Sequence, residues 1–211
     1  MVDSILFDLD GTLWDSTDIV ATAWNKAIAE DKRLQLTFTG DDLKKLFGKP
    51  LPEIASIIFG ELPRKDQLEL MDRCCHEEHT ALLKTCGTLF PKLEETLKEL
   101  STKYTLCIVS NCEDGYIETF LKASGLTAYF TDFECPGNSG LLKGDNIKLV
   151  VERNHFKQPV YLGDTQGDAD ACAYAKVPFI HASYGFGTVS NNKYKISAFS
   201  ELPSYIEKTW A

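Results

Sequence analysis

The stretch ILFDLDGTLWDS, residues 5–16, decides the fold. Three apolar residues run directly into Asp8 and Asp10, and Gly11 follows. Side chains two positions apart in an extended strand point the same way, so both carboxylates can approach one site where the strand ends. Burying two like charges is unfavourable unless something compensates them, and a divalent cation such as Mg²⁺, which prefers oxygen ligands, would do so. The alternative is an ordinary Asp-Gly turn that merely ends the strand.

The overall composition limits the possible partners. The chain has 211 residues, 44% of them hydrophobic, with a net charge of −9 and a pI of about 5.0. A nucleic-acid partner is not expected, because no basic excess is present. A membrane partner is not expected either, because no apolar run has the length of a membrane span. Seven scattered cysteines do not form a disulfide pattern, which favours reduced thiols and a cytoplasmic setting.

Short apolar runs alternate with helical patterns over most of the chain. Strands are expected at residues 4–10, 104–111, 128–135, 159–164 and 178–183, and helices at 91–100, 114–125 and 144–154. Such alternation predicts an α/β fold with a Rossmann-like parallel sheet and helices on both of its faces.

The segment 15–88 breaks this alternation. It contains no convincing strand and shows helical patterns at residues 16–31, 40–48, 51–60 and 63–87. About 70 residues are far more than an ordinary crossover connection needs. We therefore expect a helical cap subdomain at 15–88, inserted into a core formed by residues 1–14 and 89–211.

Other expected strand ends carry polar groups that match the first. Ser110 and Asn111 can donate hydrogen bonds to phosphate oxygens, and Asp164 and Asp168 supply further carboxylates. Lys143 lies between these two segments in the sequence. Taken singly, each is better explained as a helix cap, a turn residue or a solvated lysine. Their coincidence at the ends of parallel strands, where open sheets bind ligands, favours one shared site.

These motifs resemble those of the haloacid dehalogenase superfamily of phosphotransferases. The chain offers FDLDGTLWDS as the first motif, IVSN as the second, Lys143 as the third and LGDTQGD as the fourth. The position of the helical insert resembles the subgroup that includes phosphoglycolate phosphatases and β-phosphoglucomutases. One departure lies at the third motif, where Gly144 follows the lysine instead of the frequent proline. Lys148 and Lys157 are therefore alternatives to Lys143.

The resemblance implies roles for individual residues. Asp8 would be the nucleophile that forms an aspartyl-phosphate, Asp10 the general acid and base, and Lys143 the third catalytic residue. The implied Mg²⁺ ligands are Asp8, the backbone carbonyl of Asp10, Asp164 and, through water or by holding the lysine, Asp168. The implied phosphate-binding groups are Ser110, Lys143 and the backbone N–H groups near Leu9 and Asn111.

The expected cap offers weaker candidates. Lys49, in the turn FGKPLPEI, would approach the substrate or be an ordinary solvated lysine. Trp14 would line the cleft, although an aromatic residue in such a pattern is more often part of the core. The run CCHEEH at residues 74–79 lacks a second ligand pair at zinc-site spacing, so we expect an exposed helix face there.

The predicted function is that of a Mg²⁺-dependent phosphatase for small organic phosphate monoesters such as phosphoglycolate, a sugar phosphate or a nucleotide monophosphate. A sugar-phosphate mutase would use the same core residues and is the main alternative. A dehalogenase would need neither Asp10 nor a metal, and a non-catalytic binding module would not need the complete set of residues. The partner expected is therefore a small phosphorylated metabolite, bound by a monomer or a homodimer.

Overall fold

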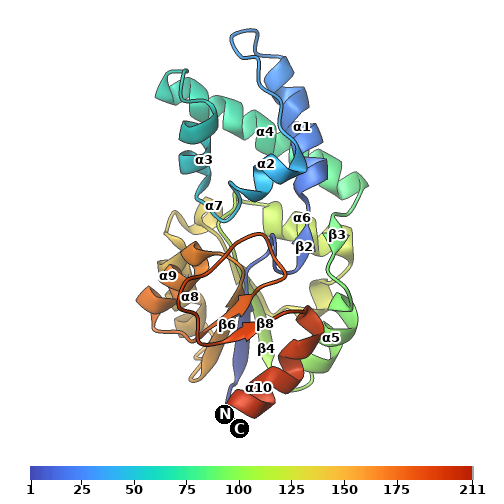
Figure 1. The fold of residues 1–211 in the computed structure, drawn as a ribbon, viewed down its shortest axis with the longest axis vertical. Helices are drawn as coiled ribbons and strands as arrows, with labels where there is room; N and C mark the ends of the chain where they lie inside the picture. Colours follow the sequence, from blue (N-terminus) through green and yellow to red (C-terminus); the bar gives the residue numbers. More distant parts are fainter. Residues whose placement is uncertain (211) are drawn as a thin grey trace.

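The computed structural model describes residues 1–210 and shows a sheet-based core with a group of helices at one end (Figure 1). The sheet has the strand order β5-β4-β1-β6-β7-β8, and every neighbouring pair is parallel. Its strands are β1 (Ser4–Phe7), β4 (Thr105–Val109), β5 (Asp132–Glu134), β6 (Pro159–Gly163), β7 (Phe179–Ala182) and β8 (Lys195–Ile196). The expected parallel α/β sheet is thus confirmed, with strands shorter than expected and with β8 in addition.

Helices cover both faces of this sheet (Figure 1). One face carries α8 (Lys143–Arg153) and α9 (Gln166–Ala175), and the other carries α5 (Leu93–Leu100), α6 (Tyr116–Ser124) and α10 (Leu202–Trp210). The shorter elements are α7 (Pro136–Ser139), η1 (Thr127–Tyr129) and η2 (Phe199–Glu201). Because η1 occupies part of the strand expected at residues 128–135, β5 is reduced to three residues.

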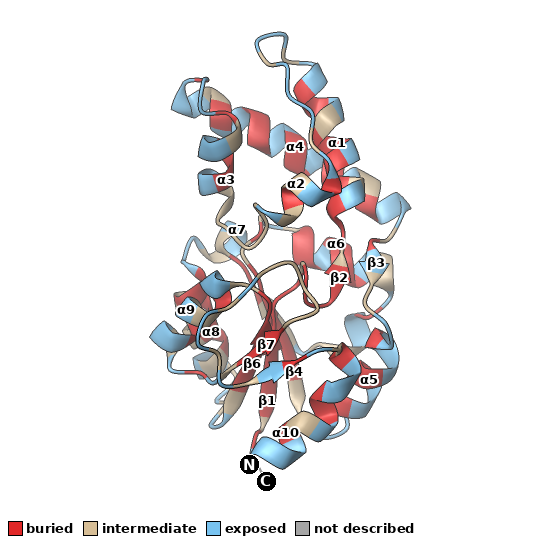
Figure 2. Cartoon of the chain, viewed as in Figure 1, coloured by how far each residue is buried: buried red, intermediate tan, exposed pale blue. Residues whose placement is uncertain are grey.

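The strand side chains alternate between two hydrophobic clusters, as the pleat of a strand requires. In β1, Ile5 and Phe7 belong to the larger cluster, whereas Leu6 points to the α8–α9 side. All three are fully buried, and Figure 2 shows the central strands buried over most of their length, with intermediate residues where β4 and β6 begin. A strand that is apolar on both faces is typical of a parallel sheet between two helical layers.

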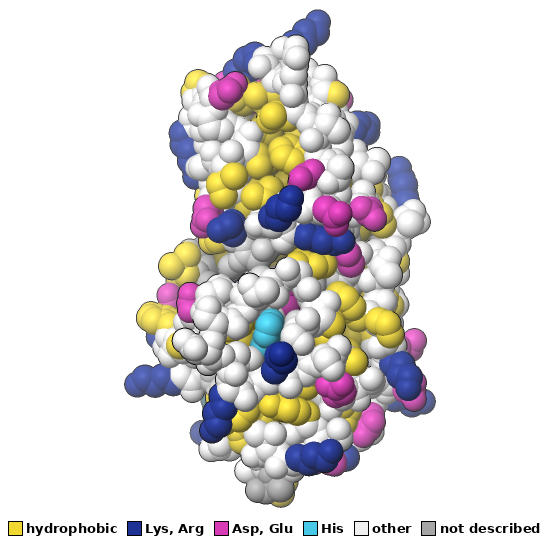
Figure 3. Space-filling view, viewed as in Figure 1, with side chains coloured by type: hydrophobic (Ala, Val, Ile, Leu, Met, Phe, Trp, Pro, Cys, Tyr) yellow, Lys and Arg dark blue, Asp and Glu magenta, His cyan; other side chains and the backbone are white. Residues whose placement is uncertain are grey.

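Four helices form a group that we call the helical unit: α1 (Thr17–Ala29), α2 (Gly40–Lys44), α3 (Leu51–Ile58) and α4 (Arg64–Lys84). It lies beyond the carboxyl ends of the sheet strands (Figure 1). The two connections to the core pair with each other as a short antiparallel ladder of β2 (Trp14–Asp15) and β3 (Thr88–Leu89). Figure 3 shows hydrophobic side chains gathered on one face of this unit, with charged side chains where it meets the core.

Two details differ from the sequence-based expectations. The expectation of an exposed face at residues 74–79 is wrong, because Cys74, Cys75 and Glu78 are buried. Helix α5 begins at Leu93 and not at residue 91, because Lys92 has a left-handed backbone with φ of 61° and cannot continue a helix. No helix among residues 1–210 is both long and apolar enough to cross a membrane.

The packing of Phe7 allows a test of this core. Its ring centroid lies 6.1 Å from that of Phe130 and 6.0 Å from that of Phe199, and the side chain is fully buried. We expect Phe7→Ala to lower the free energy of unfolding by about 3–5 kcal/mol, measured by urea denaturation, because it leaves a cavity. The control Leu83→Ala, at a position 46% exposed, should change it by less than about 1 kcal/mol. A small loss for Phe7→Ala would contradict the packing described.

Candidate active site

The register of the sheet brings three strand ends together. Phe7 of β1 pairs with Ile108 of β4 on one side and with Leu162 of β6 on the other. Asp8, which follows Phe7, therefore lies between the ends of these two strands, close to Ser110 and Asp164. The chain passes from β1 to β4 on one side and later returns from β5 to β6 on the other side of β1. At such a switch point the carboxyl ends of the strands form a crevice.

Asp8 is the central carboxylate of this crevice. Its Oδ1 atom accepts hydrogen bonds from Ser110 Oγ at 2.9 Å and from Lys143 Nζ at 2.6 Å. Burial and the nearby Asp168 raise the pKa of Asp8 to about 6, although the Lys143 ammonium opposes this shift. The carboxylate is thus held in place by one hydroxyl and one cation.

Lys143 bridges two carboxylates, because its ammonium also donates to Asp168 Oδ1. The lysine is only 4% exposed. Burial alone would lower its pKa, but Asp168 and Asp8 raise it above the ordinary value, so the side chain stays charged. Of the lysines that the sequence left open, Lys148 instead forms a 3.9 Å pair with Asp145 on the surface.

Asp168 is fixed by the start of α9. Its carboxylate accepts from the backbone N–H and the hydroxyl of Thr165, and its own N–H donates to that hydroxyl at 3.2 Å. This reciprocal arrangement is a capping box, and it satisfies the free N–H groups of the helix end. The remaining carboxylate oxygen is the one that receives Lys143.

Asp164 has an unsatisfied oxygen. Its Oδ2 accepts from the backbone N–H groups of Phe186 at 2.7 Å and Gly187 at 3.2 Å, whereas its buried Oδ1 has no partner. Burial, followed by Asp168 and Asp8, raises its pKa well above the usual value. Oxygens of Asp8, Asp164 and Asp168 lie within 4.8 Å of one another. An orphaned carboxylate oxygen in an all-oxygen cluster fits a hard divalent cation.

Asp10 faces a different set of groups. Its Oδ1 accepts from Ser16 Oγ at 2.7 Å and from Tyr116 Oη at 3.0 Å. Burial raises the pKa of Asp10 to about 7. The hydrogen bond from Ser16 opposes this increase in pKa, whereas the negative charge of Asp8 adds to it. A carboxyl group with such a pKa can give or take a proton near neutral pH.

Gly11 makes the close approach of the two strand ends possible. Its φ is 81°, in the left-handed region, and a Cβ atom there would lie 2.3 Å from Asp164 Oδ2. Any other residue would be strained in this backbone conformation and would displace the Asp164 carboxylate.

Of the other predicted site residues, some line the cavity at Asp8 and others do not. Asn111 and Lys49 line one cavity with Asp8 and Asp10, although the Asn111 amide donates to Gly48 O at 2.8 Å. The Lys49 ammonium pairs with Glu53 at 2.9 Å. The side chain of Leu9 is fully buried. Trp14 is fully buried against Tyr116 and Phe120, so it belongs to the core and does not line the cleft.

Several groups at the site were not anticipated. Ser16 and Tyr116 hold Asp10, and the loop with Phe186 and Gly187 holds Asp164. The glycines of SYGFG, residues 183–187, were the one available signal for that loop, because backbone donors need close approach. Tyr116 gave no such signal, since it follows the apolar pattern of its helix.

Comparison with known proteins agrees with this arrangement. A model of the haloacid dehalogenase-like hydrolase family matches residues 5–182. The phosphoglycolate phosphatase of Vibrio parahaemolyticus is 27% identical over 94% of this chain and 93% of its own length. That of Agrobacterium fabrum is 28% identical over 87% and 82%. A crystal structure of a predicted phosphatase from Clostridium acetobutylicum has the same fold, with a TM-score of 0.80 at 21% identity and 99% coverage of both chains.

The chain therefore belongs to the haloacid dehalogenase-like hydrolase family. It is accordingly an enzyme, a hydrolase of the phosphatase type.

The buried ion pairs of Lys143 give a testable stability difference. Lys143→Met leaves Asp8 and Asp168 buried without their cation, so we expect the free energy of unfolding at pH 7 to fall by about 3 kcal/mol. Lys148→Met removes the same charge from a half-exposed position of the same helix and should cost less than about 1 kcal/mol. Chemical denaturation of both variants measures the difference. Equal losses would show that the Lys143 pairs are not formed.

Proposed function

We propose that the enzyme hydrolyses small organic phosphate monoesters through an aspartyl-phosphate on Asp8, with Mg²⁺ as its cofactor. The observation that carries this proposal is the set of buried carboxylates around Lys143 at the carboxyl ends of β1 and β6. Family membership and the phosphatase relatives support it.

In the first step, a carboxylate oxygen of Asp8 attacks phosphorus and the bond from phosphorus to the leaving oxygen breaks. Asp10 gives its proton to that leaving oxygen. Ser110 and Lys143, which donate hydrogen bonds to Asp8, would hold phosphoryl oxygens beside it. Lys143 also offsets part of the repulsion between the ionised nucleophile and the anionic substrate.

In the second step, water attacks phosphorus of the aspartyl-phosphate, and inorganic phosphate leaves with Asp8 restored. Asp10, now ionised, takes the proton from the attacking water and returns to its initial state. A pKa of about 7 suits a group that must serve in both protonation states. The hydrogen bonds that Ser16 and Tyr116 donate to Asp10 would hold its carboxyl group in the same position in both steps.

The groups that would hold Mg²⁺ are the carboxylates of Asp8 and Asp164 and the backbone carbonyl of Asp10. Asp168 would bind water molecules on the ion or hold Lys143. The unpartnered Oδ1 of Asp164 supports this assignment. The ion would supply positive charge that stabilises the transferred phosphoryl group. The helical unit would close over the crevice as a cap and exclude bulk water, with residues 14–15 and 88–89 as its connections.

Removal of the nucleophile tests the covalent step. We expect Asp8→Asn to reduce the hydrolysis of p-nitrophenyl phosphate at least about a thousandfold, because the amide is a poor nucleophile. The far-ultraviolet circular dichroism spectrum should stay that of the native protein. Asp41→Asn, a matched change at a side chain 84% exposed, should keep full activity. An active Asp8→Asn enzyme would refute the assignment.

Chelation tests the metal. We expect EDTA to abolish p-nitrophenyl phosphate hydrolysis and excess MgCl₂ to restore it. Independently of activity, Mg²⁺ should raise the thermal unfolding temperature of the wild type, because binding to the native state stabilises it. Asp164→Asn should remove that rise, while the surface variant Asp41→Asn should retain it. Hydrolysis that is indifferent to EDTA would be incompatible with a metal cofactor.

A further inference from the structure

The cavity at the proposed nucleophile continues into a larger one. The first is lined by Asp8, Asp10 and Glu78. The second, of about 470 Å³, runs along α4 between the helical unit and the core. Leu51, Asn111, Cys112 and Glu113 line both cavities, so the two adjoin. Because Asp8 would hold the phosphoryl group, we take the larger cavity, which shares these four residues with the first, as the place of the rest of a substrate and call it the leaving-group cavity.

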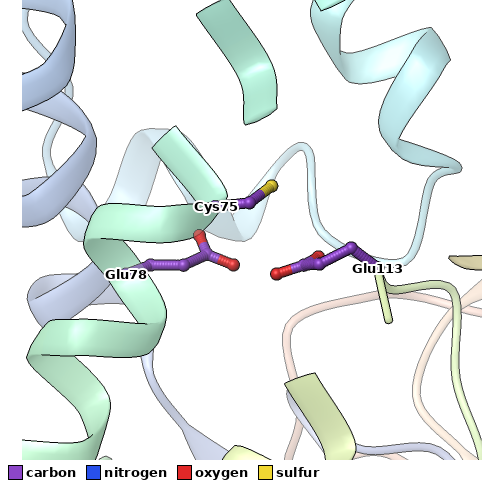
Figure 4. Close-up of side chains that lie close together, drawn as sticks. All are labelled: Cys75, Glu78 and Glu113. Atoms are coloured by element: carbon purple, nitrogen blue, oxygen red, sulfur yellow. The ribbon is translucent and has the colours of Figure 1, made fainter. Parts of the chain in front are cut away.

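A pair of acidic side chains stands at the junction of these cavities. Glu78 comes from α4, and Glu113 comes from the loop that follows β4; their carboxyl groups point toward each other (Figure 4). Their oxygens and Cys75 Sγ lie within 4.8 Å of one another. The indole N–H of Trp24 donates to Glu78 Oε2, and Glu113 Oε1 lies 2.8 Å from His79 Nε2.

The two carboxyl groups differ in the direction in which their surroundings shift their pKa values. Burial and the facing Glu113 raise the pKa of Glu78 well above its usual value. Although burial opposes it, hydrogen bonds with His79 and Glu78 hold the pKa of Glu113 below its usual value. A protonated Glu78 next to an ionised Glu113 avoids two buried like charges. The junction therefore presents hydrogen-bond acceptors and a negative charge to a bound substrate.

Little positive charge is available to balance a second anionic group. Among the described residues, Lys49 is the only lysine or arginine that lines either cavity, and its ammonium already pairs with Glu53. The leaving-group cavity is also lined by the acids Asp72 and Asp114 and by His76 and His79, and the His79 ring is already bonded to Glu113. A substrate carboxylate in this cavity would face Glu113 without a free cation.

A metal ion between Cys75, Glu78 and Glu113 is less favoured by the same contacts. Both carboxyl groups already have partners in Trp24 and His79. Burial also raises the pKa of the Cys75 thiol, which keeps it in the protonated form that binds metals poorly. The acidic pair is therefore better suited to contact substrate.

From this geometry, and resting on the proposed phosphatase function, we infer that Glu113 and Glu78 determine specificity. They select phosphate monoesters whose leaving group is a neutral polyhydroxy alcohol, and they exclude substrates with a second anionic group. Hydroxyl groups can donate to Glu113, and such hydrogen bonds to a charged acceptor are the stronger kind. A carboxylate or a second phosphate would instead meet the like charge of Glu113. Phosphoglycolate, the substrate named for the relatives, is then a poor substrate of this chain.

The experiment compares two substrates of nearly equal size. 2-Hydroxyethyl phosphate and 2-phosphoglycolate differ only in a CH₂OH group against a carboxylate. We expect the wild type with Mg²⁺ to prefer 2-hydroxyethyl phosphate at least about tenfold in kcat/KM, which corresponds to about 1.4 kcal/mol. Equal values, or a preference for phosphoglycolate, would overturn the inference.

Two variants locate the source of that preference. Glu113→Gln keeps the shape of the side chain and removes its charge, so the preference should fall about tenfold, mainly through better use of phosphoglycolate. Glu118→Gln makes the same change at an exposed position of α6 and should leave the preference unchanged. A preference that persists in Glu113→Gln would show that Glu113 is not its source.

Binding separates this inference from the proposed function. Calorimetric titration of the Asp8→Asn variant with each compound, in the presence of Mg²⁺, measures selection without turnover. Tighter binding of 2-hydroxyethyl phosphate, together with no hydrolysis of either compound by the wild type, would contradict the proposed phosphatase mechanism alone. Hydrolysis of both compounds with equal binding would contradict the specificity inference alone.

Discussion

The balance of charge around Lys143 is the constraint on which the site depends. Asp8, Asp164 and Asp168 are all buried, and one ammonium reaches only Asp8 and Asp168. Carboxylates removed from water are stable only when they are paired, hydrogen-bonded or protonated. Here burial, followed by the neighbouring carboxylates, raises the pKa values of Asp8 and Asp164. The cluster thus holds more buried carboxylates than the single Lys143 ammonium can pair, and this is the reason a divalent metal is part of the proposal.

The backbone supplies the order that this cluster requires. The central position of β1, with β4 and β6 as its neighbours, places three polar strand ends side by side, and the capping box of α9 adds Asp168. Neither of these structural features is specific to catalysis, because strand register and helix caps occur in every α/β protein. What is specific is that each ends in a charged or hydrogen-bonding side chain directed into one crevice. Substitution of Gly11 would disturb this arrangement through sterics alone.

The sequence was informative at the ends of the buried strands. The apolar strands and the polar residues directly after them predicted the sheet, and also the neighbourhood of Asp8, Ser110 and Asp164. It failed for β2, β3 and β8, because two-residue strands have no periodicity to detect. It also could not pair Glu78 with Glu113. One lies in an apparently ordinary charged helix and the other in a loop, and only the docking of α4 over the sheet brings them together.

The two ends of the crevice differ in charge, and this difference bears on what the enzyme would accept. At the phosphoryl end, Lys143 and the proposed cation attract an anion. At the junction with the leaving-group cavity, the lowered pKa of Glu113 favours a negative charge where a leaving group would lie. Attraction at one end and repulsion at the other would orient a monoester with a single phosphate, because the reversed orientation places its phosphate against Glu113. The acidic pair would then contribute to positioning as well as to selection. Because Glu78 lies on α4 of the helical unit and Glu113 on a loop of the core, both effects depend on the docking of that unit on the core.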